Sequence, residues 1–265
     1  MKSFRVGDPE IGEFYRANGY VCLQDMVQHS LLERVRDEIL LIFETAFGEP
    51  GGGFELLKAA YFDERKPIWQ SCAKRMHMVL PIQEAVGSQR VESTLKQCGL
   101  LQPSVSTFAE VRTDMPGDSK YMQPWHQDWR YGQSSYNSVT IWTPLHDVTR
   151  EHGAVALVPR THLNGLYPYK ERLSPRAFLI DEADQFDHLE HVVAAIPFGH
   201  SIIFSQFLVH GSLPNVSGEM RLTFQMRFAD LQERNFVRNQ YRVPIGSELV
   251  WPDEPRAEDV RAAFA

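Results

Sequence analysis

The sequence predicts a mainly β protein with flanking helices, in which helices pack on the outside of a β-sandwich or jelly-roll barrel. Two observations support this fold class. The first hundred residues show helical apolar spacing, and short β-rich runs separated by Gly, Pro, Asn and Asp follow residue 103. The length of 265 residues suffices for one substantial core and is usually too short for two enzyme domains, so we expect one domain over 1–265.

Residues 1–102 are expected to form a mostly helical support for the barrel. A first helix is predicted after Asp8 and Pro9, because aspartate caps the free N–H groups at a helix start and proline suits the first turn. Gly19 is predicted to end this helix, since glycine readily adopts the left-handed conformation that closes helices.

A second helix is predicted over residues 29–47, where apolar side chains recur at helical spacing. These side chains are Leu32, Val35, Ile39, Ile42, Phe43 and Ala46. The glycine-rich stretch 48–53 breaks this helix. A third helix is expected over about 80–97 and is closed by Gly99.

Residues 103–230 are expected to form the jelly-roll core, and residues 231–265 a C-terminal extension. The predicted strands cover about 104–113, 137–145, 153–159, 191–198, 200–207 and 220–228. The polar segment 163–189 interrupts these strands as a loop-rich excursion. Together with loops at 48–66 and 113–124 it is expected to build the substrate pocket and to cover the mouth of the barrel.

Composition and charge argue against several partners. The formal net charge is -7 and no long Lys/Arg run occurs, so we expect no binding to nucleic acid. No segment approaches the roughly 18 uninterrupted apolar residues of a membrane span, and the N-terminus lacks the apolar core of a signal peptide. Cys22, Cys72 and Cys98 are widely spaced, which indicates reduced thiols in a cytoplasmic protein. The sequence leaves the oligomeric state open.

The sharpest chemical feature is the stretch Trp125-His126-Gln127-Asp128. In a strand, residues two apart point to the same face, so His126 and Asp128 would present a nitrogen and an oxygen ligand side by side. Ferrous iron in oxygenases binds two histidines and one carboxylate on one face of an octahedron, which leaves three positions open. Since His-x-Asp pairs often occur by chance, the pair gains weight only with a second histidine.

The second histidine is predicted to be His210, which lies 84 residues after His126. It follows an apolar strand and precedes a Gly-Ser-Leu-Pro-Asn turn, an arrangement that five other histidines at strand ends or in loops lack. These five are His146, His152, His162, His191 and His200. Among them His162 is the tempting extra ligand, and we interpret it as a structural histidine in a loop.

The run 221–228 alternates strictly between polar and apolar residues. Arg221, Thr223, Gln225 and Arg227 share one face of the predicted strand, and apolar residues share the other. Two interpretations are open: the polar face contacts water on a half-buried strand, or it lines the barrel lumen. In the lumen an arginine could pair through its planar fork with a carboxylate.

Other polar and aromatic residues allow plainer interpretations. Glu110 and Arg112 share a face of an earlier strand, so an ion pair is expected there rather than a catalytic role. An aromatic cluster is expected to pack around the metal pair and consists of Trp125, Trp129 and Tyr131. Arg130 would share the metal-facing side if the strand continues, so Arg130 and Tyr131 are candidate substrate contacts.

The chain resembles a known family, the phytanoyl-CoA dioxygenase-like iron(II)/2-oxoglutarate oxygenases. The resemblance runs through most of the chain. It is carried by FYRANGYVCLQDMVQHSLLERVRDEI, WHQD, SVTIWTPLHDVTREHGAVALVPRTHLNG and VHGSLPNVSGEMRLTFQMRF. Family members usually have Gly-Ser-His where this chain has Arg160-Thr161-His162. That departure leaves the metal and co-substrate residues unchanged.

The resemblance implies a double-stranded β-helix, which is a cupin-like jelly roll. The implied iron ligands are His126, Asp128 and His210. It further implies that Arg221 pairs with the distal carboxylate of 2-oxoglutarate, and that Ser212 and Trp142 line the same pocket. The implied enzyme is a dioxygenase that uses iron(II), 2-oxoglutarate and O2 to hydroxylate an unactivated C–H bond of a small-molecule metabolite, with release of succinate and CO2.

Several alternatives stay open beside hydroxylation. Asp128 disfavours halogenation, because the related halogenases have Gly or Ala at this position, where chloride binds. Desaturation, cyclisation and epimerisation share the same iron site. A non-catalytic jelly-roll binding or sensing module would lack one of the ligands, and a hydrolase could use zinc, which also accepts two histidines and one carboxylate. The intact ligand set together with Arg221 favours the oxygenase.

Overall fold

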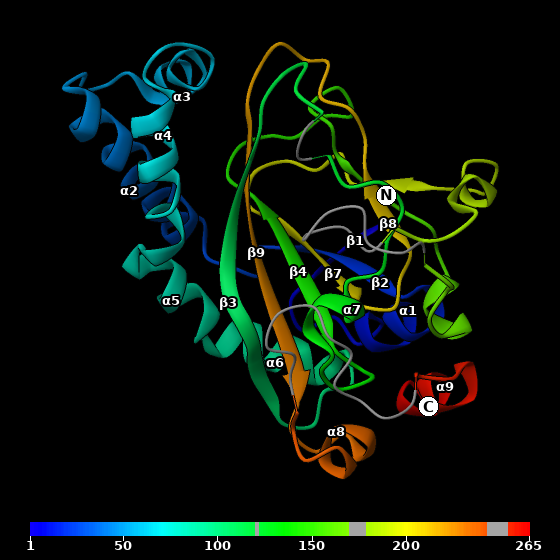
Figure 1. Cartoon of the computed structure of the whole chain (residues 1–265). Helices are drawn as coiled ribbons and strands as arrows, with labels where there is room; N and C mark the ends of the chain where they lie inside the picture. Colours follow the sequence, from blue (N-terminus) through cyan, green and yellow to red (C-terminus); the bar gives the residue numbers. More distant parts are fainter. Residues whose placement is uncertain (120–121, 170–178, 243–253) are drawn as a thin grey trace.

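The computed structural model describes residues 1–119, 122–169, 179–242 and 254–265, and its centre consists of two β-sheets (Figure 1). The larger sheet has the order β1 (Ser3–Arg5), β2 (Tyr20–Gln24), β7 (His200–Ser205), β4 (Val139–Pro144), β9 (Arg221–Asp230) and β3 (Pro103–Asp114). The smaller sheet has the order β6 (Val192–Val193), β5 (Val155–Leu157) and β8 (His210–Ser212). Apart from the parallel pair β1–β2, these neighbouring strands run antiparallel.

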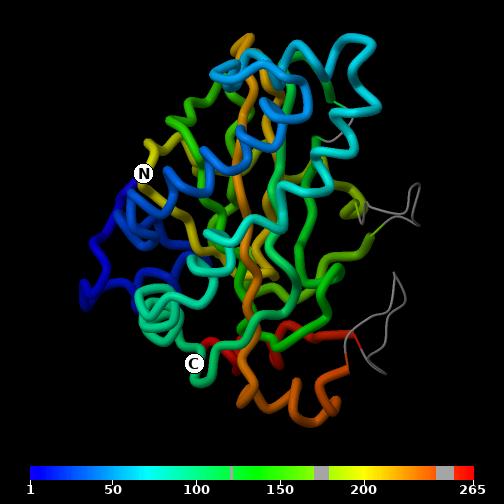
Figure 2. The backbone as a smooth tube through the Cα atoms, turned by 90° about the vertical axis from the view of Figure 1, so that its left-hand side faces the viewer, coloured from blue at the N-terminus to red at the C-terminus, as the bar shows by residue number. Residues whose placement is uncertain are grey.

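Helices precede and follow the strands of the core. Those before β3 are α1 (Ile11–Asn18), α2 (His29–Phe47), α3 (Gly53–Phe62), α4 (Lys66–Ala73), η1 (Met76–Met78), α5 (Leu80–Val86) and α6 (Gln89–Gln97). Those after it are α7 (Trp129–Gly132), η2 (Thr161–Asn164), η3 (Ala183–Phe186), α8 (Arg234–Arg238) and α9 (Ala257–Ala263). The helices α2 to α5 cover the outer side of the larger sheet, and in the turned view of Figure 2 they cross in front of its strands.

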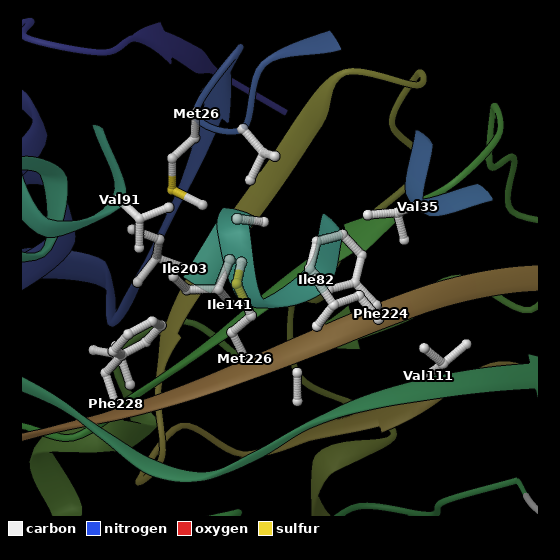
Figure 3. Packing of buried hydrophobic residues seen from close by; sticks show 14 of the residues in the cluster. Met26, Val35, Ile82, Val91, Val111, Ile141, Ile203, Phe224, Met226 and Phe228 are labelled. Carbon is white, nitrogen blue, oxygen red and sulfur yellow. The ribbon is translucent and has the colours of Figure 1, made fainter. Parts of the chain in front are cut away.

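Each face of the larger sheet carries a layer of the hydrophobic core. On the outer face, Phe224 and Met226 of β9 belong to the same cluster as Val35 of α2 and Ile82 of α5 (Figure 3). On the inner face, apolar residues from both sheets form a second cluster, which includes Tyr20, Cys22, Trp142, Leu157, Ile202 and Phe204. The sheets therefore enclose an interior of their own, separate from the layer under the helices.

The predicted helix ends are confirmed at two glycines. Gly19 ends α1 with φ 79°, and Gly48 ends α2, which covers the predicted residues, with φ 69°. Both values lie in the left-handed region that glycine adopts at low cost. The start of α1 lies later than expected: the side chain of Asp8 accepts a hydrogen bond from the Glu10 N–H at 2.9 Å, and the helix begins at Ile11.

Two predictions for the helical half are wrong. The single helix expected over about 80–97 consists of α5 and α6, because Ser88 starts a new helix by accepting a hydrogen bond from the Val91 N–H at 3.3 Å. The segment 48–66 is not a pocket loop. Residues 53–62 form α3, and its Leu57 and Ala60 are buried in the outer core layer.

The six predicted strands correspond to β3, β4, β5, β6, β7 and β9, so the predicted fold class is confirmed. Parts of the predicted mouth-covering segments, 120–121 and 170–178, lie outside the described residues, as does 243–253 of the predicted C-terminal extension. Where the structure is described, none of its helices is long and apolar enough to span a membrane. The three cysteines are free thiols, and all three are buried.

Gly19 gives a stability prediction, because a Cβ there would collide with Nδ1 of the buried His162 and φ is positive. Gly19→Ala should lower the free energy of unfolding by more than the roughly 1–2 kcal/mol of a left-handed alanine, measured by urea denaturation. Gly218→Ala is the matched control, since φ is +80° and nothing lies within 4 Å of its Cβ position. Equal losses in the two variants would contradict a steric role for His162.

Candidate metal centre

Strand pairing brings the predicted metal ligands together. His126 and His210 form an isolated antiparallel bridge, in which the N–H of each donates to the carbonyl of the other at 2.9 and 3.1 Å. Their rings therefore lie side by side, with centroids 4.1 Å apart. Asp128 completes the group, because its Oδ1 lies 3.5 Å from His126 Nε2 and 3.7 Å from His210 Nε2.

The segment around Asp128 differs from the continuous strand that the sequence predicts. His126 is bridged to its neighbour, but Asp128 already occupies the N-cap position of the short helix α7. The chain turns at this point, so strand alternation does not continue to Arg130. The prediction that Arg130 shares the metal-facing side is therefore wrong.

Backbone carbonyls orient both histidines. The Nδ1 of His126 lies 2.7 Å from the carbonyl of Pro124, and that of His210 lies 2.9 Å from the carbonyl of Leu208. Because a carbonyl only accepts, Nδ1 carries the proton in each neutral ring and Nε2 keeps its lone pair. Metal-binding histidines use this arrangement, in which the outer nitrogen donates and the inner one coordinates.

Burial and neighbouring charges set the protonation states. Burial raises the pKa of Asp128, but Arg227 and the two histidines lower it by more than burial raises it. The pKa therefore lies well below its usual range. Burial and the neighbouring His126 lower the pKa of His210 to about 3. At neutral pH a carboxylate thus stands beside an uncharged imidazole, and these are the forms that bind a metal cation.

The donor set itself limits which metals fit. Two imidazole nitrogens and one carboxylate oxygen lie within 4.8 Å of one another, and all three residues are buried. Across the described ranges, no other group of three His, Cys, Asp or Glu side chains comes together in this way. Two histidines and a carboxylate on one side suit iron(II), with positions left open for other ligands. Zinc accepts the same donors.

The polar face of β9 lines the interior of the barrel. Arg221 is 1% exposed, and its Nη2 lies 2.7 Å from Asp114 Oδ2 on the neighbouring strand β3. Farther along the same face, Arg227 reaches Asp128. Of the two interpretations of this strand, a polar face in water is therefore wrong and a polar face in the lumen is confirmed.

Several buried donors on this face have no acceptor. The Nε and Nη1 of Arg221, the Nε1 of Trp142 and the hydroxyl of Thr223 lack a hydrogen-bond partner within the described part of the chain. The Arg221 guanidinium carbon lies 6.0 Å from the centre of the Trp142 ring. Since buried unpaired donors are uncommon and costly, the cluster fits a bound group that accepts hydrogen bonds, such as a carboxylate.

Charge supports the same conclusion. Asp114 lies 2.7 Å from Arg221 and 3.4 Å from Arg112, so two guanidinium groups share one carboxylate. Burial raises the pKa of Asp114, but the two arginines lower it more, and the group stays ionised at neutral pH. Asp114 contacts Nη2 of Arg221 and leaves the Nε and Nη1 donors of that arginine available to a bound anion.

The structure does not unite all the residues predicted for 2-oxoglutarate. Ser212 lies on β8, two residues after His210, and lines a cavity of about 340 Å³ together with Trp125. Its backbone N–H donates to the carbonyl of Gln123 at 2.7 Å. Among the described residues, no hydrogen bond joins Ser212 to Arg221.

The two candidate substrate contacts lie in different surroundings. The Nη1 of Arg130 lies 3.2 Å from Glu254 Oε1, and its guanidinium carbon lies 3.6 Å from the centre of the Tyr169 ring. This arginine therefore faces other segments of the chain. The ring of Tyr131 is 6.1 Å from that of His126, which places Tyr131 beside the metal ligands.

Sequence reasoning missed the residues that hold Asp128. The Thr140 hydroxyl donates to Asp128 Oδ2 at 2.7 Å, and Arg227 Nε lies 3.4 Å from the same oxygen. Glu110 pairs with Arg227 at 3.3 Å, and Arg112 lies 3.4 Å from Asp114, so each of these two residues forms an ion pair with another partner. The alternation of β9 placed Arg227 on the correct face, but only the register between strands shows which residues it meets.

The sequence model of the phytanoyl-CoA dioxygenase (PhyH) family matches residues 15–223. This chain belongs to the phytanoyl-CoA dioxygenase family. The predicted family, the double-stranded β-helix and the enzyme class, a 2-oxoglutarate-dependent non-haem iron dioxygenase, are confirmed. The iron and 2-oxoglutarate of this class suit the donor set and the arginine pocket of the barrel. A binding module and a zinc hydrolase are therefore set aside.

Two relatives of this chain come from a mammal and a bacterium. The chain is 23% identical over 246 residues to the peroxisomal phytanoyl-CoA dioxygenase of Bos taurus, with 82% of this chain and 67% of that enzyme covered. It is 24% identical over 243 residues to the 1-deoxypentalenic acid 11-beta-hydroxylase of Streptomyces arenae, with 82% of this chain and 79% of that enzyme covered.

Solved structures share the family fold. EvdO2 from Micromonospora carbonacea var. aurantiaca has a TM-score of 0.60 at 17% identity, covers 86% of this chain and 93% of its own, and is also known complexed with 2-oxoglutarate. The alpha-ketoglutarate-dependent carbocyclase SnoK from nogalamycin biosynthesis has a TM-score of 0.56 at 14% identity, with 97% and 99% covered. The epimerase SnoN, in complex with Fe3+, alpha ketoglutarate and nogalamycin RO, has a TM-score of 0.54 at 14% identity. This match covers 93% of this chain and 94% of SnoN.

Arg221 is expected to set the affinity for 2-oxoglutarate. Removing one partner of a buried charged pair costs about 2–5 kcal/mol, or roughly 30-fold to several thousand-fold in affinity. Arg221→Ala should weaken 2-oxoglutarate binding by this factor in anaerobic calorimetric titrations and leave iron binding largely intact. Arg112→Ala, which removes a charge but not the unpaired donors, should have a smaller effect. Unchanged affinity in Arg221→Ala would move the assignment to Arg227.

Proposed function

We propose that this chain hydroxylates an unactivated C–H bond of a small-molecule metabolite, using iron(II), 2-oxoglutarate and O2 and releasing succinate and CO2. One observation carries the proposal. A single barrel interior holds a buried His–Asp–His group and, on the polar face of β9, an arginine with unpaired donors. Family membership supports the reaction class, and these side chains support the assignment of residues.

The metal would be held by His126 Nε2, His210 Nε2 and Asp128 Oδ1. The hydrogen bonds from Nδ1 to backbone carbonyls orient both rings before a metal binds, and Thr140 anchors the other oxygen of Asp128. Because all three ligands lie on one side, the opposite side stays open for 2-oxoglutarate and O2.

The co-substrate would be anchored by Arg221. The unpaired N–H groups of its Nε and Nη1 lie on the two sides of Nη2, and a carboxylate can accept from either side. Asp114 lies 2.7 Å from Nη2, so the guanidinium is already oriented before a ligand binds. The indole N–H of Trp142 supplies a further donor. The assignment of Ser212 to this pocket rests on the family resemblance alone, since Ser212 lines a cavity beside Trp125.

When bound, iron and 2-oxoglutarate supply the activation of O2, in which 2-oxoglutarate becomes succinate and CO2. The residues of the chain place the reactants and keep the pocket dry. The inner core layer reaches the site at Phe204, whose ring lies 4.5 Å from the His210 ring, centre to centre. The three metal ligands are therefore 3–6% exposed.

Hydroxylation is the outcome that the site favours. Asp128 fills the position that would otherwise receive a halide, and the relative from Streptomyces arenae carries the name of a hydroxylase. SnoK and SnoN are a carbocyclase and an epimerase on the same fold, so cyclisation and epimerisation are the alternatives, together with desaturation.

The substrate is proposed to be a small molecule that contacts Tyr131 beside the metal ligands. The net charge of -7 speaks against a nucleic acid. Arg130 would reach the substrate only by exchanging its contact with Glu254, so it is the weaker of the two proposed contacts.

Loss of either histidine ligand should abolish tight iron binding. His126→Ala and His210→Ala each remove one of three donors, so anaerobic titration should show one iron(II) per chain in the parent and none held tightly in the variants. His152→Ala is the matched control, since this histidine is not part of the triad and its Nε2 lies 3.2 Å from Glu219 Oε2. This variant should bind iron like the parent. If both triad variants bound iron like the parent, the ligand assignment would be wrong.

Succinate formation should depend on O2 and increase with a substrate. A metabolite screen with iron(II), 2-oxoglutarate and ascorbate should find compounds that stimulate succinate release in the parent but not in His126→Ala. Mass spectrometry then separates the outcomes: a gain of one oxygen atom supports hydroxylation, whereas a loss of two hydrogens or an unchanged mass indicates the alternatives. Absence of any succinate from protein shown to bind iron and 2-oxoglutarate would contradict the proposed reaction class.

A further inference from the structure

The two oxygens of Asp128 have different surroundings. Oδ1 faces the Nε2 atoms of both histidines at 3.5 and 3.7 Å. Oδ2 points the other way, accepts a hydrogen bond from Thr140 Oγ1 at 2.7 Å and lies 3.4 Å from Arg227 Nε. One oxygen is thus held by the protein, and the other is directed to the metal position.

Arg227 is itself held by three partners. Its Nε is directed at Asp128, its Nη1 lies 3.3 Å from Glu110 Oε2, and its Nη2 donates to Gln225 Oε1 at 2.9 Å. Because each nitrogen of the rigid planar group meets a different oxygen, the guanidinium cannot rotate without losing a partner. A lysine could not satisfy the same three positions at once.

The register of the larger sheet fixes this arrangement. Arg227 lies opposite Thr140 of β4, and Gln225 lies opposite Glu110 of β3. Asp128 belongs to the N-cap of α7, outside the sheet. The sheet therefore presents Thr140 and Arg227 at a fixed spacing to a carboxylate that arrives from another part of the chain.

We propose that Arg227 is a positioning residue, which turns the Asp128 carboxylate so that only Oδ1 reaches the metal. The inference rests on the proposed function, because it takes iron to bind the triad. A carboxylate can bind a cation through one or both of its oxygens. Binding through both would occupy a position that 2-oxoglutarate or O2 needs. By holding Oδ2 and supplying a positive charge, Arg227 keeps that position open.

Glu110 limits the freedom of Arg227 from the other side. Its side chain is 44% exposed, whereas that of Asp128 is 4% exposed. Arg227 therefore lies between a buried carboxylate and one near solvent, and balances part of the charge of each. A positively charged side chain at this point suits an ionised Asp128, which the metal requires.

The test compares Arg227→Gln and Arg227→Lys with the parent. Iron(II) affinity is measured by anaerobic titration, and iron geometry by the electron paramagnetic resonance spectrum of the nitric oxide adduct without 2-oxoglutarate. Arg227→Gln should weaken iron binding by about 10- to 100-fold and change the spectrum, as losses around metal ligands do. Arg227→Lys should recover part of the affinity, because the charge returns without the three-way contact.

Arg221→Gln is the matched control, because it lies on the same face of β9 and is buried but does not touch Asp128. It should keep the parent iron affinity and spectrum and weaken only 2-oxoglutarate binding. If Arg227→Gln binds iron within about twofold of the parent with an unchanged spectrum, the positioning role is overturned. If Arg227→Gln does not fold, the spectrum of Arg227→Lys decides, and a parent-like spectrum overturns the role. A parent that binds no iron would instead overturn the proposed function.

Discussion

The two backbone hydrogen bonds between His126 and His210 hold the site in register. They tie the segment before α7 to β8 and set the imidazoles 4.1 Å apart. The carbonyls that orient the rings, those of Pro124 and Leu208, each lie two residues before the histidine, so the same local geometry occurs on both sides. A slip of one residue in this pairing would turn a histidine away from the interior, and no metal group would remain.

Beside this bridge, the barrel buries several charged side chains, which costs free energy. An isolated buried ion costs several kcal/mol, and carboxylates beside the two arginines of β9 offset the cost. Asp128 and Glu110 surround Arg227, and Asp114 faces Arg221 with Arg112 beside it. The apolar face of β9 packs in the layer beneath the helices, which keeps the strand in place (Figure 3). The unpaired donors of Arg221 then mark where an anion belongs.

Local patterns were sufficient where the deciding interaction is local, and insufficient where strand pairing decides. Gly48 ends α2 because of its own backbone conformation, and the alternation of β9 is visible in the sequence. The partner of Glu110 could not be predicted, because two register shifts in β3 change which residue of β9 it meets. Arg130 was misplaced because the chain turns at Asp128. The three metal ligands could be predicted because the family resemblance linked His126 to His210 across the intervening strands.

The most direct test of the centre is an anaerobic crystal structure of the protein with iron(II) and 2-oxoglutarate, with anomalous scattering recorded at the iron edge. We expect one iron peak bonded by His126 Nε2, His210 Nε2 and Asp128 Oδ1, with the distal carboxylate of 2-oxoglutarate on the guanidinium of Arg221. Iron at another place, or a distal carboxylate away from Arg221, would contradict the assignment of the barrel interior as the catalytic centre.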